Sequence, residues 1–442
     1  MYKQTLMSKI GRRKFLSYST TASIAAASSS VLLKACAPSD VSFIDGTSTA
    51  NSTQISNSAD AGTSTIKVGL LHSLTGPLAI SEAPIVDAEL LAIREINDSG
   101  GLLGKQLVPI QADGASDWPA FAEKAEKLIA QDQVSVIFGG FTAASRKAIL
   151  PVVTAKNHLL CYPGVDEGQE CAKNIVYGGA TVNQQIEPAV NWMLANRGKN
   201  FFLVSENDRS VHAIAKAILK EKGGTVAGEA FLPLDGSINI DMRPLINDIK
   251  QALPEGGIIF NSLIGEQNRV FFKAIKARLM SGKYLVMSTR LSETDILQIG
   301  PDFFRNHYAA WHYFQTLDTP ENEKWVNSFQ QTYGKDQVLS APMASAYNLV
   351  HLWAKAVQQA QSSQPAAVHT AAYEQTFSAP SGSATIRPNN RLIQSAYIGK
   401  VQDNGQFEIL WRSNNPIEPD PWSQKIDSNE DLTCDWTDSD QK

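Results

Sequence analysis

From about residue 65 onward, short apolar runs alternate with longer stretches in which apolar and polar residues are mixed. Runs such as 65–74 and 107–114 are rich enough in Val, Ile and Leu to predict strands that are buried on both faces. The stretch 85–96 instead repeats apolar residues three and four positions apart, which is typical of a helix with one buried face. Strands that alternate with helices in this way predict parallel βαβ units.

Two series of this kind follow one another, over residues 65–163 and 201–291. Each series is long enough to form one sheet, so we predict an α/β fold with two doubly wound, Rossmann-like lobes. Sheets of this type bind ligands beyond the carboxyl ends of their strands. A cleft between the two lobes is therefore the expected binding site.

The last third of the chain follows a different pattern. Thr319 and Pro320 predict a capped helix start, and a long helix is expected over 343–361. Residues 396–411 predict a hairpin with Asp403, Asn404 and Gly405 at its tip, and residues 425–442 form a polar tail.

The first 65 residues predict an export signal and a tether. Arg12 and Arg13 precede a weakly apolar, Ala- and Ser-rich region, and Leu33 and Ala35 lead to Cys36 in a pattern that resembles a bacterial lipobox. We predict that residues 1–36 form a twin-arginine, lipoprotein-type signal and that Cys36 carries the lipid anchor; a buried cysteine without a role is the alternative. Residues 37–65 are dominated by small polar residues and predict a flexible tether. The expected location is the periplasm or the cell surface, with the protein anchored to the membrane.

The composition narrows the classes of function. The 442 residues include 39 Lys and Arg against 44 Asp and Glu, for a net charge of −5, which leaves no basic footprint for nucleic acid. The longest apolar stretch is too short and too rich in Ser to span a bilayer. The four cysteines contain no CxxC pair. Two alternatives are open for Cys161: it forms a disulfide with Cys171, or it occupies a buried position in the core. Cys434 is expected to be unpaired.

The sequence contains none of the motifs GxGxxG, GxxxxGK[ST], HExxH or GxSxG. We therefore expect no enzyme activity, no catalytic residues, no cofactor and no metal. Two polar loops follow predicted strands instead, at 73–82 and at 139–145. The second loop opens a helix, whose free N–H groups would favour an anionic or carbonyl oxygen, although capping by Thr142 or Ser145 explains the same residues.

Several stretches, among them IKVGLLHSLTGPLAISE, FGGFTAASRKAILPVV and LLCYPGVDEGQE, carry a specific resemblance. In collinear order they cover about 66–424, and the chain resembles the type I periplasmic solute-binding proteins of the branched-chain amino acid/amide/urea ABC-transporter family, most closely the urea and short-chain amide branch. The resemblance implies two lobes that are joined by three crossovers, near Asn183, Phe314 and Ser378. Lobe 1 would then comprise 66–183 plus 314–378, and lobe 2 would comprise 184–313 plus 379–424.

The resemblance also implies a set of pocket residues. Phe141 and Tyr162 match aromatic side chains that stack on a planar amide, while Ala143 and Gly164 stand where the family has a serine and a threonine. Glu266 matches an acid that receives the ligand ammonium in relatives that bind amino acids. The expected ligand-binding residues are Ser81, Glu82, Phe141, Thr142, Ala143, Tyr162, Gly164, Asp208, Ser210 and Glu266.

The implied function is capture of a small nitrogen-containing solute by hinge closure and its delivery, by a monomer, to an ABC permease in the membrane. The family's tyrosine pair falls at Asp208 and Ser210, so urea, a short-chain amide and an amino-acid-like compound all remain candidates for the solute. Carboxylates over aromatic rings would hold a cationic or NH-rich molecule, although Asp208 is equally consistent with a solvated loop charge. A membrane-tethered ligand sensor and a secreted hydrolase are the alternative functions.

Overall fold

The structure is a computed structural model that describes residues 65–206, 209–233, 240–279 and 282–437. The signal, Cys36 and the tether lie outside the described residues, as does Asp208, so what was predicted for them stays a prediction. Within the described ranges, no helix combines the length and the apolar character that a bilayer crossing requires.

The first sheet is wholly parallel, with the strand order β2-β1-β3-β4-β5. The buried strand predicted at 65–74 is β1, in which Val68, Leu70 and Leu71 are at most 1% exposed. Val68 and Leu70 contribute to a different core cluster from Leu71, because successive side chains of a strand point to opposite faces. The strands are β1 (Thr65–His72), β2 (Gln106–Asp113), β3 (Ile137–Gly139), β4 (Leu160–Tyr162) and β5 (Ile175–Tyr177).

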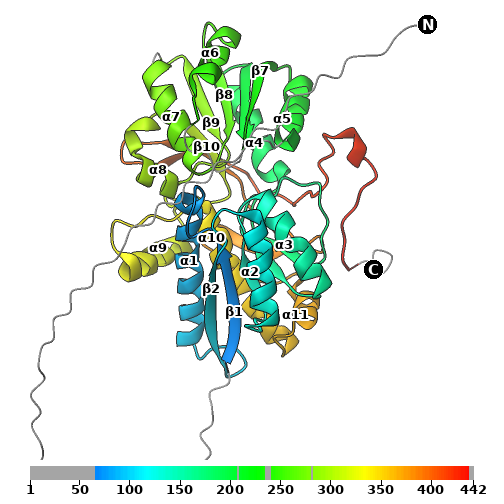
Figure 1. Cartoon of the computed structure of the whole chain (residues 1–442). Coiled ribbons are helices and arrows are strands. Elements are labelled where there is room, and N and C mark those ends of the chain that lie inside the picture. The colour runs from blue at the N-terminus through cyan, green and yellow to red at the C-terminus, as the bar shows by residue number, and fades with distance from the viewer. Residues whose placement is uncertain (1–64, 207–208, 234–239, 280–281, 438–442) are drawn as a thin grey trace, which may run out of the picture. The chain divides into compact units, whose positions relative to one another are not determined.

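Helices cover both faces of this sheet, as the doubly wound prediction requires (Figure 1). One face packs against α1 (Ala79–Asp98) and α10 (Ala341–Ala360), and the other packs against α2 (Trp118–Ala130) and α3 (Ala143–Ala155). The predicted amphipathic stretch 85–96 lies within α1, with Ile85, Ala88 and Ala92 fully buried.

The second sheet has the order β15-β14-β10-β9-β8-β6-β7. Its five strands from β6 to β10 are parallel, and the predicted hairpin forms the antiparallel edge pair β14–β15. The strands are β6 (Asn200–Glu206), β7 (Thr225–Leu232), β8 (Gly257–Ser262), β9 (Tyr284–Ser288), β10 (Tyr308–Trp311), β14 (Tyr397–Val401) and β15 (Phe407–Arg412). The helices of this lobe are α4 (Val182–Asn196), α5 (Arg209–Lys222), α6 (Arg243–Ala252), α7 (Glu266–Arg278) and α8 (Glu293–Ile299).

After β10 the chain returns to the first lobe. The predicted capped start at Thr319 and Pro320 opens α9 (Pro320–Tyr333), where Thr319 Oγ1 accepts a hydrogen bond from the Asn322 N–H at 3.1 Å. Then follow α10, α11 (Pro365–Ala372) and a small antiparallel sheet of β11 (Thr376–Ala379), β12 (Gly382–Ile386) and β13 (Leu392–Ile393).

The third crossover comes later than expected. Residues near Ser378 were predicted to lead to the second lobe, but Ser378 pairs with Ser383 in the β11–β12 hairpin, and the polar stretch is simply its turn. Arg391 still bridges to Tyr177 in the first sheet. The chain therefore joins the second sheet only after Ile393, where β13 ends.

Of the two alternatives that the sequence left open, the buried core position of Cys161 is confirmed and its disulfide with Cys171 is not formed. Cys171 is bonded to Cys434, with Cα atoms 5.8 Å apart, and Cys161 is a free thiol that is 2% exposed. Cys161 belongs to β4 and packs into the core, which explains why it does not pair with Cys171 ten positions later. The expectation that Cys434 is unpaired was wrong.

Candidate functional site

A cavity of about 480 Å³ opens where strands of both sheets end. Helices α2 and α3 and the β4–β5 loop border it from the first lobe, while the end of β6, the start of α5 and the loop after β9 border it from the second. We call this space the interlobe cavity. Its lining residues are Trp118, Thr142, Ala143, Ala144, Lys147, Glu167, Gly168, Gln169, Glu206, Arg209, Ser210 and Arg290.

The start of α3 combines the two alternatives that the sequence left open. Thr142 Oγ1 accepts from the Ser145 N–H at 3.0 Å, and Ser145 Oγ accepts from the N–H groups of Phe141 and Thr142 at 3.2 and 3.1 Å, so the helix is capped. The N–H groups of Ala143 and Ala144 have no partner among the described residues, and both alanines line the cavity. Two donors at the positive end of the helix dipole therefore face the cavity.

Ionic contacts join the two lobes at the cavity wall. Arg290 Nη2 of the second lobe lies 3.7 Å from Glu167 Oε1 of the first lobe, and both side chains are less than 10% exposed. Arg146 Nη1 donates to Glu167 Oε2 and Arg146 Nε to Glu170 Oε1, each at 3.0 Å. Burial by itself would lower the pKa of Arg146, but the neighbouring acids, Glu167 foremost, outweigh it and raise that pKa. Arg146 is therefore a permanent positive charge beside Glu167 and Glu170.

Three of the predicted ligand-binding residues, Thr142, Ala143 and Ser210, line the cavity. The two predicted aromatic walls do not line it. Phe141 is 2% exposed, and Tyr162 is fully buried with its hydroxyl donating to the Phe141 carbonyl at 2.8 Å. Burial raises the pKa of the Tyr162 phenol, which remains protonated.

Gly164 lies behind the same helix start and is required there by packing. A Cβ atom on Gly164 would lie 2.3 Å from the Phe141 carbonyl oxygen and 2.4 Å from the Tyr162 hydroxyl. Trp118 lines the cavity and supplies its aromatic surface.

Ser81, Glu82 and Glu266 lie outside the cavity lining, and Ser81 and Glu266 belong to a contact between the lobes. Ser81 Oγ donates to Asp295 Oδ1 of the second lobe at 2.6 Å, and the Glu266 N–H donates to the Pro77 carbonyl at 3.3 Å. The Glu266 carboxylate itself is paired with an arginine one helical turn along. The Ser81 side chain and the Glu266 backbone therefore contribute to the contact between the lobes, and neither the Glu82 nor the Glu266 carboxylate lines the interlobe cavity.

Glu82 belongs to a buried cluster behind that contact. Its Oε2 accepts from the Ser73 N–H at 2.7 Å, and the fully buried His72 lies 2.9 Å from Glu89. Burial foremost raises the pKa of Glu82. Burial would lower the pKa of His72, but the two carboxylates outweigh it and raise that pKa.

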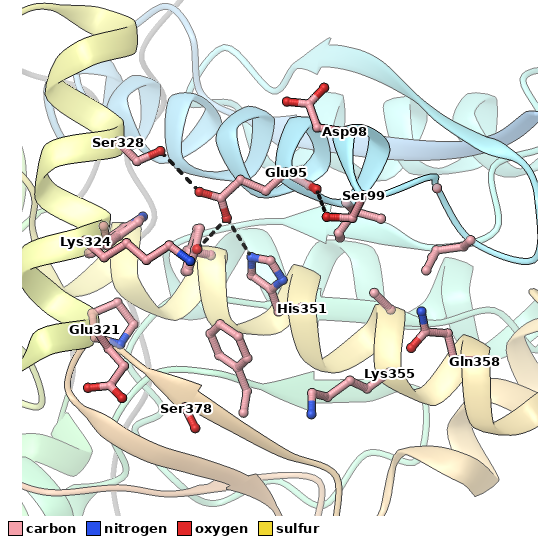
Figure 2. A pocket seen from close by; sticks show the side chains of 18 residues that line it. Glu95, Asp98, Ser99, Glu321, Lys324, Ser328, His351, Lys355, Gln358 and Ser378 are labelled. Carbon is pink, nitrogen blue, oxygen red and sulfur yellow. Dashed lines mark hydrogen bonds and ion pairs between the residues drawn. The ribbon is translucent and has the colours of Figure 1, made fainter.

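A second and larger cavity, of about 800 Å³, lies between α1, α9, α10 and β11 (Figure 2). Glu95 is held there by the Tyr347 hydroxyl at 2.6 Å, the Ser328 hydroxyl at 3.3 Å and His351 Nε2 at 3.3 Å. Although desolvation opposes it, these contacts lower the pKa of Glu95. None of the predicted site residues lines this space, and its carboxylate is engaged by protein donors, so the interlobe cavity is the better candidate site.

A serine–histidine pair is also present, which bears on the hydrolase alternative. Ser345 Oγ and His312 Nε2 lie 2.9 Å apart. Both side chains are at most 1% exposed and neither lines the interlobe cavity, and burial lowers the pKa of His312 to about 4. The pair belongs to the packing between β10 and α10.

Two α/β lobes with a polar cavity between the ends of their strands define a bilobed binding protein. Residues 66–428 match the family described as a periplasmic binding protein domain, and the chain belongs to this family. Its fold is the type I periplasmic binding protein fold, an α/β arrangement with parallel sheets.

Two curated proteins illustrate the range of relatives. The Leu/Ile/Val-binding protein homolog 6 of Brucella melitensis is 24% identical over 363 residues, which cover 77% of this chain and 89% of that protein. A protein named limonene hydroxylase from Geobacillus stearothermophilus is 35% identical over 123 residues. That second match spans 28% of this chain and only 23% of the relative's length.

Two solved structures share the fold. One is a solute binding protein of an ABC transporter from Rhodopseudomonas palustris BisB5 in complex with 3,4-dihydroxybenzoic acid, with a TM-score of 0.72, 22% identity, and coverage of 80% of this chain and 99% of that one. The other is a branched-chain amino acid transporter substrate binding protein from Streptococcus pneumoniae in complex with isoleucine, with a TM-score of 0.68, 19% identity, and coverage of 80% of this chain and 100% of that one.

Proposed function

We propose that the chain is the substrate-binding component of an ABC transporter, exported and anchored through Cys36, and that it carries an amino-acid-like solute to a membrane permease. The observation that carries the proposal is the start of α3, where the N–H groups of Ala143 and Ala144 face the interlobe cavity. Paired N–H donors at a helix start suit a carboxylate. A cavity of about 480 Å³ is within the range of small-molecule sites.

The charges around the cavity support a zwitterion. Lys147 and Arg209 supply positive charge toward a carboxylate, and Glu206 lines the same space and would receive an ammonium group. Names of similar proteins agree with this chemistry, since one relative is called a Leu/Ile/Val-binding protein homolog and one structural neighbour was solved with isoleucine.

The interlobe cavity gives less support to urea and short amides than the sequence pattern did. A flat neutral amide would need the aromatic wall of Phe141 and Tyr162, and both rings are buried behind the helix start. Urea and acetamide also carry no negative charge to complement the two N–H groups of α3. Among the three solutes that the sequence left open, the amino-acid-like compound fits best.

An aromatic acid is the second candidate, and the position of Trp118 favours it. Its indole lines the cavity beside the start of α3, where it would pack against a benzoate ring whose carboxylate meets the helix N–H groups. Such a ligand has no ammonium and would leave Glu206 without a role in recognition, which is why we rank it second.

Isothermal titration calorimetry on the full chain, after extensive dialysis, tests the proposal with L-leucine, L-isoleucine, 3,4-dihydroxybenzoate, urea and acetamide. We expect the amino acids to bind and the two amides to give no heat. Binding of 3,4-dihydroxybenzoate alone would establish the second candidate. Binding of urea or acetamide without any carboxylate would overturn both.

A further inference from the structure

The loop between β4 and β5, residues 163–174, forms one wall of the interlobe cavity. Glu167, Gly168 and Gln169 contribute to the lining, yet no helix or strand is present in this loop. Irregular backbone keeps one shape only where other parts of the chain hold it, because every unrestrained residue regains conformational entropy. The restraints on this loop therefore set the shape of the cavity.

Besides the contacts of Arg146 and Arg290 described above, several of these restraints come from residues more than 200 positions later in the chain. The buried Arg391 donates through Nε to Asp166 Oδ2 at 2.5 Å and through Nη2 to the Glu170 carbonyl at 2.7 Å. The Gln169 N–H donates to the Pro421 carbonyl at 2.9 Å. Both ends of the cavity-lining segment are thus held by the C-terminal part of the chain.

The disulfide between Cys171 and Cys434 is the covalent member of this set, with a sequence separation of 263. Cys434 lies beyond residue 428, where the family match ends. The segment that leads to it is attached to the second lobe, since Lys425 Nζ lies 2.5 Å from Glu221 Oε2 of α5. The disulfide therefore joins a first-lobe loop to a chain segment that is held on the second lobe.

We infer that the Cys171–Cys434 disulfide positions the cavity wall, so that the oxidised protein holds loop 163–174 in the ligand-binding shape and the reduced protein binds its ligand more weakly. Cys171 and Cys434 are the positioning residues, acting through Glu167, Gly168 and Gln169. The effect on ligand affinity rests on the proposed function, whereas the effect on the loop does not. An exported protein meets the oxidising conditions that keep such a bond formed.

The redox step is an ordinary thiol–disulfide exchange with a dithiol reductant. One thiolate of the reagent attacks a sulfur of the protein disulfide, which forms a mixed disulfide and releases one protein thiolate. The second thiol of the reagent then attacks the mixed disulfide and releases the other protein thiolate. The protein gains two thiols and the reagent becomes a cyclic disulfide. Cys171 and Cys434 are half-buried and reachable, whereas Cys161 is buried and its raised pKa keeps it an unreactive thiol.

Hydrogen–deuterium exchange and calorimetry on the full chain test the inference. Four samples are compared: the oxidised protein, the same protein reduced with dithiothreitol, the variant C434S, and the control C161A, which keeps the disulfide. We expect faster exchange at 163–174 in the reduced protein and in C434S than in the oxidised protein and C161A. We also expect affinity for L-isoleucine to fall about tenfold in the same two samples.

The outcomes separate this inference from the proposed function. Unchanged exchange at 163–174, with mass spectrometry showing both thiols free, would overturn the positioning role. Faster exchange with unchanged affinity would overturn its effect on the ligand. If the oxidised protein binds no member of the panel, the proposed function fails while the exchange data still decide the loop. Faster exchange in β1 as well would show that the bond stabilises the whole domain, which also overturns the inference. If C434S does not fold, the sample reduced with dithiothreitol still tests the inference.

Discussion

Arg290 of the second lobe lies 3.7 Å from Glu167 of the first lobe, at the wall of the interlobe cavity. Glu167 also accepts from Arg146 at 3.0 Å, so a single carboxylate serves two arginines from different lobes. Removing one partner of a buried ion pair is costly because the medium has low polarity, although Arg146 would keep its contact with Glu170. The two ends of this contact are therefore unequal, because Glu167 has two partners to lose.

We expect Glu167→Gln to lower the free energy of unfolding by about 3 kcal/mol, because it removes charged contacts to both Arg146 and Arg290, and Arg290→Gln by only about 1 kcal/mol. The difference arises because Arg290→Gln leaves Glu167 paired with Arg146. Urea denaturation at pH 7 measures both values.

The exposed pair of Glu126 and Lys156, at 2.7 Å, provides the matched control. Glu126→Gln should cost less than about 1 kcal/mol, as surface ion pairs generally do. Equal losses for Glu167→Gln and Arg290→Gln would show that the contact between the lobes, rather than the pair with Arg146, dominates the energy of Glu167.

The N–H of Ala143 can be removed without removing the helix. Ala143 occupies the first position of α3, where proline is well tolerated, and the preceding Thr142 has the extended backbone (φ −100°, ψ 157°) that proline requires of its neighbour. We expect Ala143→Pro to weaken L-isoleucine binding about tenfold, since a hydrogen bond to a charged group contributes roughly 1.5 kcal/mol. Calorimetry measures the affinity. Ala143→Gly keeps the N–H and should bind as the native protein does; equal losses in both variants would contradict a role for that donor.

The fold was largely predictable because buried parallel strands leave a local signature. The runs around Val68 and Leu70 need no long-range information, since a strand covered on both faces must be apolar along its whole length. Short elements carried too little pattern: β5 has three residues and α8 has seven, and both were missed. Ser378 was misread because hairpin turns and crossovers use the same polar, Pro- and Gly-containing residues.

The candidate site was predictable in place but not in detail. Residues that follow strands, such as Thr142 and Ser210, line the cavity because the carboxyl ends of parallel strands meet at one edge. Side-chain direction is not encoded in the same way, so Phe141 was expected at the ligand and points into the core. Arg290 lay within the predicted strand at the end of the second series, so its place in the loop after β9 was not recognised.

The cysteine pairing was not predictable from spacing. Cys171 and Cys434 are separated by 263 positions, and only folding brings their Cα atoms to 5.8 Å. Four cysteines allow several pairings that sequence cannot rank. The short interval between Cys161 and Cys171 gave a false impression of proximity, because a strand and its following loop direct the two side chains to different surroundings.

The predicted anchor can be tested apart from the fold. We expect the full chain, produced with its own N-terminus in a bacterial host, to fractionate with membranes and to carry lipid on Cys36. The variant C36S should move to the soluble fraction, because stable anchoring depends on the acyl chains. Mass spectrometry of the N-terminal peptide measures the modification. A C36S protein that stays with the membrane would contradict lipid anchoring at this cysteine.

Glu293 gives the stability of the protein a specific dependence on pH. The side chain lies in the first turn of α8 and is 1% exposed; its Oε1 accepts from the Gln315 N–H at 2.9 Å, whereas Oε2 has no hydrogen-bond partner in the described part of the chain. Burial foremost raises the pKa of Glu293 from 4.5 to about 8. The folded protein therefore holds this proton more tightly than the unfolded chain does. The stabilisation is fully present below about pH 4.5 and is lost as the pH rises through about 8.

Glu293→Gln removes the titration while keeping an acceptor of the same size. Between pH 5 and pH 8 the free energy of unfolding of the native protein should fall relative to that of the variant by up to about 1.4 kcal/mol per pH unit, which is the value for one proton. Urea denaturation at four pH values measures this difference, and groups that titrate equally in both proteins cancel from it. The exposed Glu321, also in the first turn of a helix, provides the control: Glu321→Gln should run parallel to the native protein. Parallel curves for Glu293→Gln would instead show that Glu293 is ionised in the folded protein, which would require a donor for Oε2 that the described residues do not supply.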